Sequence, residues 1–144
     1  MDLERAIEIA VTAHKGQRDK AGQPYILHPL RVMFDLESND ERIVGVLHDV
    51  VEDCAGWSFE RLQREGFSKP VVNAVEQVTA RPGESYDEFI QRAGTNRLAR
   101  SVKMADLRDN MRLDRIANPT EKDFERIEKY KRALAALAGS NRRN

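Results

Sequence analysis

Four ionisable side chains stand close together in one otherwise apolar stretch of the sequence. His48, Asp49, Glu52 and Asp53 interrupt a run of valines and leucines. On a helix, at about 100° per residue, these four positions fall within an arc of about 140°, so all four can point into one cleft. Burying an imidazole together with three carboxylates costs free energy unless a cation or hydrogen bonds compensate. The pattern therefore predicts a divalent-metal site, with an exposed polar face of the helix as the alternative.

Two further segments carry residues of the same chemical types. His28 stands at an expected helix start among apolar residues, and Asp106 lies in an apolar helical stretch. Taken alone, His28 fits a hydrogen-bonded structural histidine and Asp106 a surface or capping group. Together with His48 and Asp49 they form a set of two imidazoles and two carboxylates. Such a mixed nitrogen and oxygen set suits Mn²⁺, Fe²⁺ or another borderline metal.

The elements that must position these residues are all expected to be helices. Apolar residues recur at helical spacing along the chain, and no stretch shows strict alternation bounded by hairpin turns. We therefore predict an all-α, compact multi-helix bundle, with 1–144 as one domain and 139–144 as a frayed tail. The expected helices cover about 3 to 16, 26 to 36, 40 to 53, 58 to 65, 69 to 80, a stretch after Ser85, 96 to 116, and 121 to 138.

Composition excludes several classes of protein. With 24 Lys and Arg against 24 Asp and Glu, the net charge is zero, which argues against a dedicated nucleic-acid binder. The single cysteine, Cys54, excludes an intrachain disulfide framework and a multi-cysteine zinc site. No apolar run approaches the roughly 20 residues that span a bilayer, and the N-terminus has no signal-peptide core. We expect a cytoplasmic protein with no membrane partner.

Four segments resemble one family in order and approximate spacing: 13–17, 22–29, 48–53 and 102–106, within a similarity that covers about residues 3–116. The chain resembles the HD-domain metal-dependent phosphohydrolases, specifically the alarmone (ppGpp) hydrolase domain of RelA/SpoT-type proteins and their small stand-alone relatives. This resemblance implies that Glu52 and Asp53 orient and deprotonate an attacking water, as carboxylates that are not metal ligands can. It also implies a metal, typically Mn²⁺, held by His28, His48, Asp49 and Asp106.

Substrate contacts transfer less directly from the family. In members of this family, the loop before the Gly-x-Pro-Tyr-Ile segment usually carries an Arg-Lys pair whose Arg stacks on guanine. This chain has Asp19 and Lys20 at the equivalent positions, and its arginine, Arg18, stands one residue before them. An aspartate cannot stack as a guanidinium does, and it repels phosphate. Arg18 and Lys20 are either substrate contacts or solvated loop charges. Lys103 and Asn110 are candidates for phosphate and ribose contacts, or else stabilise the helix surface.

The leading functional hypothesis is hydrolysis of guanosine 3′,5′-bis(diphosphate), ppGpp, to GDP and pyrophosphate. A second hypothesis keeps the chemistry but changes the substrate to another phosphorylated nucleotide, such as NADPH or a deoxynucleotide, because of Asp19. A third is a non-catalytic HD domain that only binds nucleotide. A homodimer stays open as well, because Phe124 and Leu137 on the last expected helix fit either core packing or a dimer face.

Overall fold

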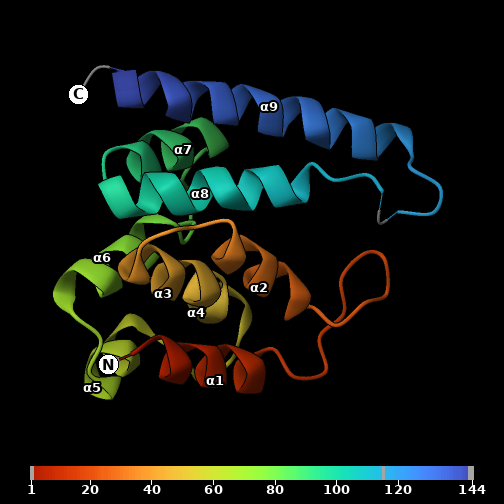
Figure 1. The fold of residues 1–144 in the computed structure, drawn as a ribbon. Coiled ribbons are helices and arrows are strands. Elements are labelled where there is room, and N and C mark those ends of the chain that lie inside the picture. The colour runs from red at the N-terminus through yellow and green to blue at the C-terminus, as the bar shows by residue number, and fades with distance from the viewer. Residues whose placement is uncertain (1, 115, 143–144) are drawn as a thin grey trace.

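The described part of the chain, residues 2–114 and 116–142 of a computed structural model, is built from helices. Its only extended pairing is an isolated bridge between Arg18 and Pro24. The predicted all-α class is therefore confirmed. In chain order (Figure 1) the helices are α1 (Leu3–Ala13), α2 (Leu27–Phe34), α3 (Asn39–Leu47), α4 (Val50–Asp53), α5 (Phe59–Glu65), α6 (Lys69–Gln77), α7 (Tyr86–Gly94), α8 (Arg97–Asn110) and α9 (Glu121–Arg142).

Short polar side chains determine where most of these helices begin. Ser38 and Ser85 each form a capping box, in which the serine accepts from the third helical amide and a glutamate, Glu41 or Glu88, accepts from the serine amide. Both motifs satisfy backbone donors that a helix start leaves without partners. The predicted break before residue 40 and the predicted capping box after Gly83 are thus confirmed. Four other helices begin with a single capping bond, in which the N-cap side chain accepts from a backbone amide of the first turn. These N-caps are Asp2 for α1, Ser58 for α5, Ser68 for α6 and Asn96 for α8.

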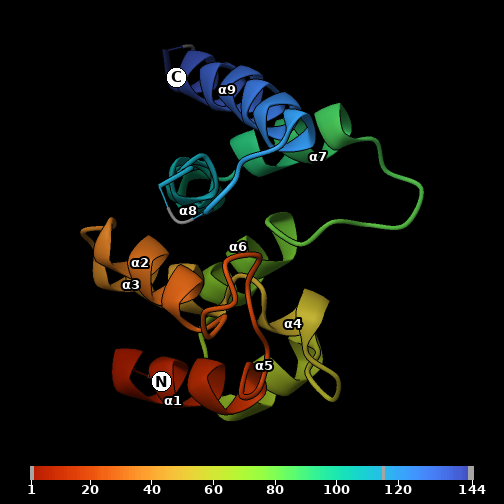
Figure 2. The same ribbon diagram turned by 90° about the vertical axis from the view of Figure 1, so that its right-hand side faces the viewer.

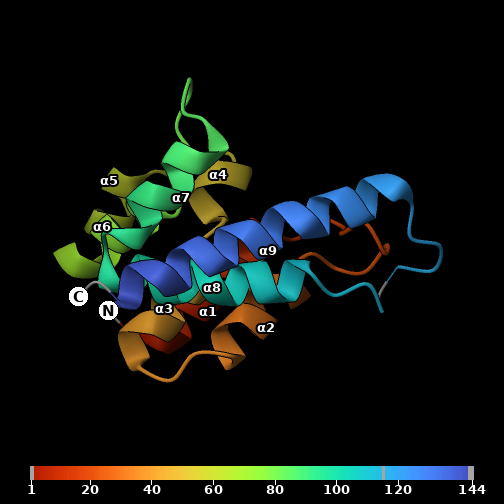
Figure 3. The same cartoon turned by 90° about the horizontal axis from the view of Figure 1, so that it is seen from above.

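The helices stack in layers around α3 and α8 (Figures 1 and 2). α9 lies over α7 and α8, which in turn cover α2, α3 and α6, while α1 and α5 form the opposite face. Seen from above, α9 runs along the length of α8 (Figure 3). The larger core cluster joins α1, α2, α3 and α6 to the underside of α8, and a smaller one fills the space between α7, α8 and α9. As predicted, the residues of α3 are buried on most sides.

The expected helix over 40 to 53 is wrong in one respect, because the chain breaks at His48 and Asp49. α3 ends at Leu47 and α4 starts at Val50. The imidazole Nδ1 of His48 lies 2.6 Å from the carbonyl oxygen of Gly45, the oxygen that an unbroken helix would bond to the amide of Asp49. This local competition ends α3 at the two residues that the sequence singled out for chemistry.

Other boundaries also differ from expectation: α1 ends at Ala13 rather than near 16, and α2 ends at Phe34 rather than near 36. α6 ends at Gln77 rather than near 80, and α8 ends at Asn110 rather than near 116. α9 continues to Arg142, beyond the predicted end near 138; the frayed tail stays a prediction, and residues 143 and 144 lie outside the described part. Alanines and leucines favour the helix here, and Ala133 and Leu137 anchor it to α7 and α8. Leu137 is therefore a core residue, whereas Phe124 is 52% exposed.

None of the described helices combines the length and the apolar character needed to cross a membrane.

Substituting alanine for Leu62 is expected to lower the free energy of unfolding by about 2–5 kcal/mol. Leu62 lies on α5 and is fully buried in the larger core cluster, so the truncation leaves a cavity in a close-packed interior. Chemical denaturation of the variant measures the change. Val11→Ala is the matched control, because Val11 is 47% exposed and its truncation should change stability by less than about 0.5 kcal/mol. Equal effects of the two substitutions would contradict the description of this core.

Candidate metal centre

The two histidines and two of the carboxylates singled out from the sequence converge from three parts of the fold. His28 comes from the first turn of α2, His48 and Asp49 from the break between α3 and α4, and Asp106 from α8. The Nε2 atoms of His28 and His48 lie 2.9 Å and 3.2 Å from the same Oδ1 of Asp106. The Oδ2 of Asp49 lies 3.2 Å from Nε2 of His48 and 3.8 Å from Nε2 of His28. All four side chains thus meet at one point.

Both imidazoles are oriented by a bond at their other nitrogen. Nδ1 of His28 lies 2.6 Å from an oxygen of Asp109, and Nδ1 of His48 lies 2.6 Å from the carbonyl of Gly45. Metal-binding histidines show this arrangement, because an acceptor at Nδ1 fixes the proton there and directs the Nε2 lone pair to the ion. Ligand atoms of His28, His48 and Asp49 also lie within 4.8 Å of one another. This donor set fits a divalent metal ion.

The carboxylates of this cluster are held in their charged form. Burial by itself would raise the pKa of Asp106, but the charge of Lys103 and the two imidazoles hold it well below its usual range. The pKa of Asp49 is likewise raised by burial but lowered further by His48, to about 2. Two charged carboxylates that share one buried point attract a cation strongly.

Lys103 and Asn110, predicted as substrate contacts, both donate to a carboxylate of the centre. Nζ of Lys103 lies 2.9 Å from one oxygen of Asp106, and Nδ2 of Asn110 lies 3.1 Å from the other. Both residues are near Asp106 on α8, one turn before and one turn after it. They orient Asp106 in this structure, and their contact with a substrate stays a prediction.

Tyr25 is a residue of the centre to which the sequence assigned no role. Its hydroxyl donates to Oδ2 of Asp49 over 2.5 Å. Burial and the neighbouring charge of Asp49 both raise the pKa of Tyr25, so it remains a neutral donor. The available signal was its place three residues before His28, which a proline follows, in one of the segments that resemble the family.

Glu52 and Asp53 follow Asp49 by one turn, on α4. One carboxylate oxygen of each lies within 4.8 Å of the other and of Asp49, and both residues are exposed. Partial burial and then the charge of Asp49 raise the pKa of both carboxyls. A raised pKa makes a carboxylate a stronger proton acceptor. His48 is thus buried and the Asp49 side chain is 13% exposed, whereas Glu52 and Asp53 are exposed. The first two residues fit the predicted metal site, and the last two fit the alternative of an exposed polar face.

A hydrogen-bond network from the end of α1 reaches the backbone of Asp53. Gln17 accepts from Nδ1 of His14 over 2.7 Å, and its Nε2 donates to the carbonyl of Asp53 over 3.1 Å. His14 is 1% exposed, and the thiol of Cys54 lies 3.4 Å from its Nδ1. These contacts give His14 a structural role and pack Cys54 against it.

The loop before α7 positions Glu52 from the other side. The amide of Ala80 donates to a carboxylate oxygen of Glu52 over 3.2 Å. Arg92 of α7 clamps this loop by donating to the carbonyl of Thr79 over 2.7 Å and to both oxygens of Glu84 over 2.7 Å and 2.9 Å. The clamp therefore fixes the loop that supplies the Ala80 amide.

The Glu84–Arg92 clamp is expected to make stability depend on pH. Hydrogen bonds from Arg92 lower the pKa of Glu84 to about 2, against about 4.3 in an unfolded chain. A depressed folded pKa stabilises the fold above the unfolded value, and this contribution is lost as the pH falls from about 4 towards 2. Glu84→Gln should therefore destabilise the protein at pH 7 but much less at pH 3. Denaturation at both pH values measures this, and an equal loss at both would contradict it.

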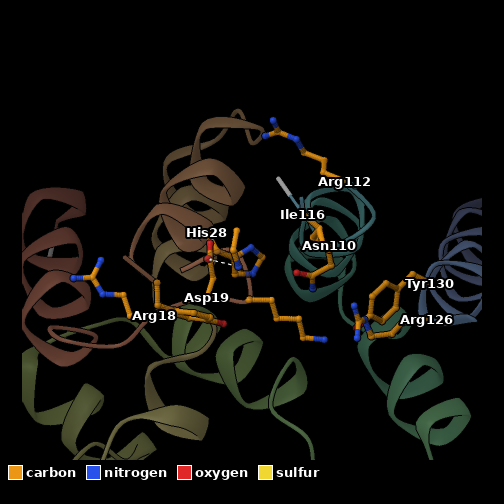
Figure 4. A pocket seen from close by; sticks show the side chains of 11 residues that line it. Arg18, Asp19, His28, Asn110, Arg112, Ile116, Arg126 and Tyr130 are labelled. Atoms are coloured by element: carbon orange, nitrogen blue, oxygen red, sulfur yellow. Dashed lines mark hydrogen bonds between the residues drawn. The ribbon is translucent and has the colours of Figure 1, made fainter. Parts of the chain in front are cut away.

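A pocket of about 250 Å³ opens beside His28, between the 16–26 loop, the end of α8 and α9 (Figure 4). Figure 4 shows His28 facing Asn110, with Arg126 beside Tyr130 on α9 and the Arg18 guanidinium directed away from them. The sequence analysis missed the contribution of α9, although Arg126 and Tyr130 are four residues apart and so share one helix face. The polar lining of the pocket includes four cations, from the 16–26 loop, the segment after α8, and α9: Arg18, Lys20, Arg112 and Arg126.

Asp19 also lines this pocket, and its side chain shapes the loop. Its Oδ1 accepts from the amides of Ala21 and Gln23, each over 2.9 Å. Aspartate favours such turns because its short carboxylate reaches the backbone two residues on. Asp19 thus holds the turn that presents Lys20, whereas Arg18 donates to the carbonyl of Gly22 over 3.4 Å.

Several curated proteins and a solved structure are similar to this chain. A guanosine-3′,5′-bis(diphosphate) 3′-pyrophosphohydrolase of Aquifex aeolicus is 30% identical over 123 residues, 77% of this chain and 17% of that protein. A GTP pyrophosphokinase of Streptomyces coelicolor is 32% identical over 123 residues, 76% of this chain and 14% of that protein. The chain thus spans less than a fifth of the length of these curated relatives.

The solved structure confirms the arrangement of the helices. It is described as a metazoan ortholog of SpoT that hydrolyzes ppGpp, and it superposes with a TM-score of 0.76 over 94% of this chain and 84% of its own. At 24% identity it shows a shared fold. The family model of the HD domain matches residues 6–142, which include every residue of the candidate metal centre. The chain therefore belongs to the HD domain family.

Proposed function

We propose that this protein is a metal-dependent hydrolase that removes the 3′-pyrophosphate of ppGpp, giving GDP and pyrophosphate. The observation that carries the proposal is the cluster of His28, His48, Asp49 and Asp106 with two exposed carboxylates one turn away. The relative from Aquifex aeolicus, named for this reaction, supports the choice of substrate.

The four clustered residues would hold the metal, which we propose to be Mn²⁺ because the set mixes imidazole and carboxylate ligands. A bound divalent ion supplies positive charge, which lowers the pKa of a water and polarises a phosphoryl oxygen. Tyr25 and Lys103 orient the two carboxylates through hydrogen bonds to Asp49 and Asp106. These hydrogen bonds hold the ligand atoms close together, which reduces the cost of ordering them when an ion binds.

Glu52 and Asp53 are proposed to receive the proton of the attacking water. Both are exposed, adjacent to Asp49, and have raised pKa values. Water attacks the phosphorus bonded to the ribose 3′ oxygen, the bond between that phosphorus and the 3′ oxygen breaks, and the 3′ oxygen takes up a proton. Positioned carboxylates of this kind accelerate proton transfer by about 10²–10⁴-fold.

The cationic pocket beside His28 is proposed to bind the nucleotide. Lys20, Arg112 and Arg126 offer positive charge for phosphate groups, and Tyr130 offers an aromatic face for a base. The base contact would thus come from α9 instead of from position 19, where Asp19 is engaged with the loop backbone.

A second candidate keeps this mechanism but acts on another phosphorylated nucleotide, with NADPH or a deoxynucleotide as examples. Asp19 is the observation that favours it, because a carboxylate in the lining of the pocket cannot stack on guanine. A domain that binds nucleotide without turnover is the remaining alternative. Cytoplasmic location and a homodimer stay predictions.

Release of GDP and pyrophosphate from ppGpp by the purified protein, with Mn²⁺ and with a chelator, tests the proposal. Metal-dependent turnover that exceeds turnover of NADPH and deoxynucleotides in parallel reactions is the expected result. A clear preference for one of the other nucleotides would replace the substrate but keep the chemistry. Nucleotide binding without turnover, in a preparation that holds the metal, would overturn the proposal in favour of a binding domain.

A further inference from the structure

A buried carboxylate stands behind His28, on the side away from the centre. Oδ2 of Asp109 lies 2.6 Å from Nδ1 of His28, and Asp109 is 7% exposed although it is charged. The bond joins α2 to α8 across 81 residues of sequence. Asp109 was not singled out from the sequence, because it follows Asp106 by three positions in a run of charged residues typical of a solvated helix face.

Arg31 holds Asp109 in this orientation. Its Nε donates to Oδ1 over 2.7 Å and its Nη2 donates to Oδ2 over 3.1 Å, a two-pronged contact that fixes the plane of the carboxylate. Arg31 follows His28 by three residues on α2, so that one helix presents two partners of Asp109, while Arg112 lies 3.8 Å from its Oδ1. The Arg31 guanidinium also supplies the charge that this largely buried carboxylate requires.

We propose that Asp109 is a positioning residue for the metal centre and that Arg31 acts through it. Asp109 accepts the Nδ1 proton of His28, which fixes the ring orientation and the tautomer whose Nε2 can bind a metal. A charged acceptor also makes the imidazole a more basic ligand, whereas His48 has only the neutral carbonyl of Gly45 for this purpose. The inference rests on the proposed function in one respect, that His28 binds the ion.

Titration of the purified protein with Mn²⁺ tests the proposal without an activity assay. Asp109→Asn preserves the shape of the side chain but removes its charge, and it should weaken Mn²⁺ binding by about 10–100-fold. Asp35→Asn is the matched control. Asp35, at the end of α2, pairs with Arg108 of α8, and the substitution removes the same negative charge as Asp109→Asn does. The control should bind Mn²⁺ within about twofold of the wild-type protein. Thermal unfolding of each variant establishes that it is folded.

A second variant covers the case in which Asp109→Asn does not fold, and a spectroscopic readout reports the hydrogen bond of His28 directly. Arg31→Lys keeps the charge but loses the two-pronged contact, and it should weaken Mn²⁺ binding severalfold, by less than Asp109→Asn. In protein loaded with diamagnetic Zn²⁺, the Nδ1 proton of His28 should resonate downfield through its bond to a carboxylate. This resonance should move upfield in Asp109→Asn and stay in place in Asp35→Asn.

The outcomes separate this inference from the proposed function. Wild-type affinity for Mn²⁺ in a folded Asp109→Asn variant overturns the positioning role while leaving the metal centre intact. Equal weakening by Asp109→Asn and Asp35→Asn also overturns it, because the effect would then come from charge or helix packing. If the wild-type protein and a His48→Ala variant bind Mn²⁺ equally poorly, the metal centre itself fails, and the positioning role fails with it.

Discussion

The His48→Ala protein is expected to lose Mn²⁺ binding by more than about 100-fold and to show no measurable turnover of ppGpp. His48 is 2% exposed, and its Nε2 lies 3.2 Å from carboxylate oxygens of both Asp49 and Asp106. Its removal deletes one nitrogen ligand and leaves two buried carboxylates facing each other without the imidazole between them. Metal titration and the release of pyrophosphate from ppGpp measure the two losses separately.

The control for this variant is Val11→Ala, an exposed truncation on α1 that should retain both metal binding and turnover. Circular dichroism and thermal unfolding establish whether His48→Ala is folded, since a buried side chain is lost. A folded His48→Ala protein with unchanged turnover would show that the centre has no part in the reaction. Added chelator should reproduce the loss of turnover in the wild-type protein, and readded Mn²⁺ should restore it.

Glu52→Gln is expected to lower kcat for ppGpp by about 10²–10⁴-fold while Mn²⁺ affinity stays near the wild-type value. The amide oxygen of glutamine can still accept from the amide of Ala80, so the side chain should keep its position. It cannot take a proton from water, however. Steady-state kinetics separates the effect on kcat from that on KM, and a Mn²⁺ titration reports the metal centre.

Asp53→Asn is expected to have an effect of the same kind, and the double variant should lose less than the product of the two single losses. Two carboxylates within 4.8 Å of a common neighbour act on one proton, so their contributions are not independent. Glu8→Gln, an exposed change of the same charge on α1, is the matched control and should leave kcat unchanged. Parallel loss of kcat and of Mn²⁺ affinity in Glu52→Gln would identify Glu52 as a metal ligand instead of a base.

The sequence by itself determined which segments are helical and which residue types carry the chemistry. Helix starts such as those at Ser38 and Ser85 depend on contacts within three residues, so a short window of sequence contains the whole signal. The apolar surroundings of His48 and Asp49 likewise indicated a buried polar cluster. These features are local, and local patterns can be interpreted without knowing how the helices pack.

Only the tertiary structure decided how these residues are used. The imidazole of His48 bonds locally to the Gly45 carbonyl, but its Nε2 also lies 3.2 Å from an oxygen of Asp106, 58 residues away. Lys103 and Asn110 turn towards Asp106, and α9 supplies Arg126 and Tyr130 to the pocket. Asp109 meets His28 because α2 packs on α8, a contact across 81 residues that no periodicity encodes. Side-chain partners separated this widely are set by packing geometry, whereas the sequence specifies directly only what lies within a few turns of helix.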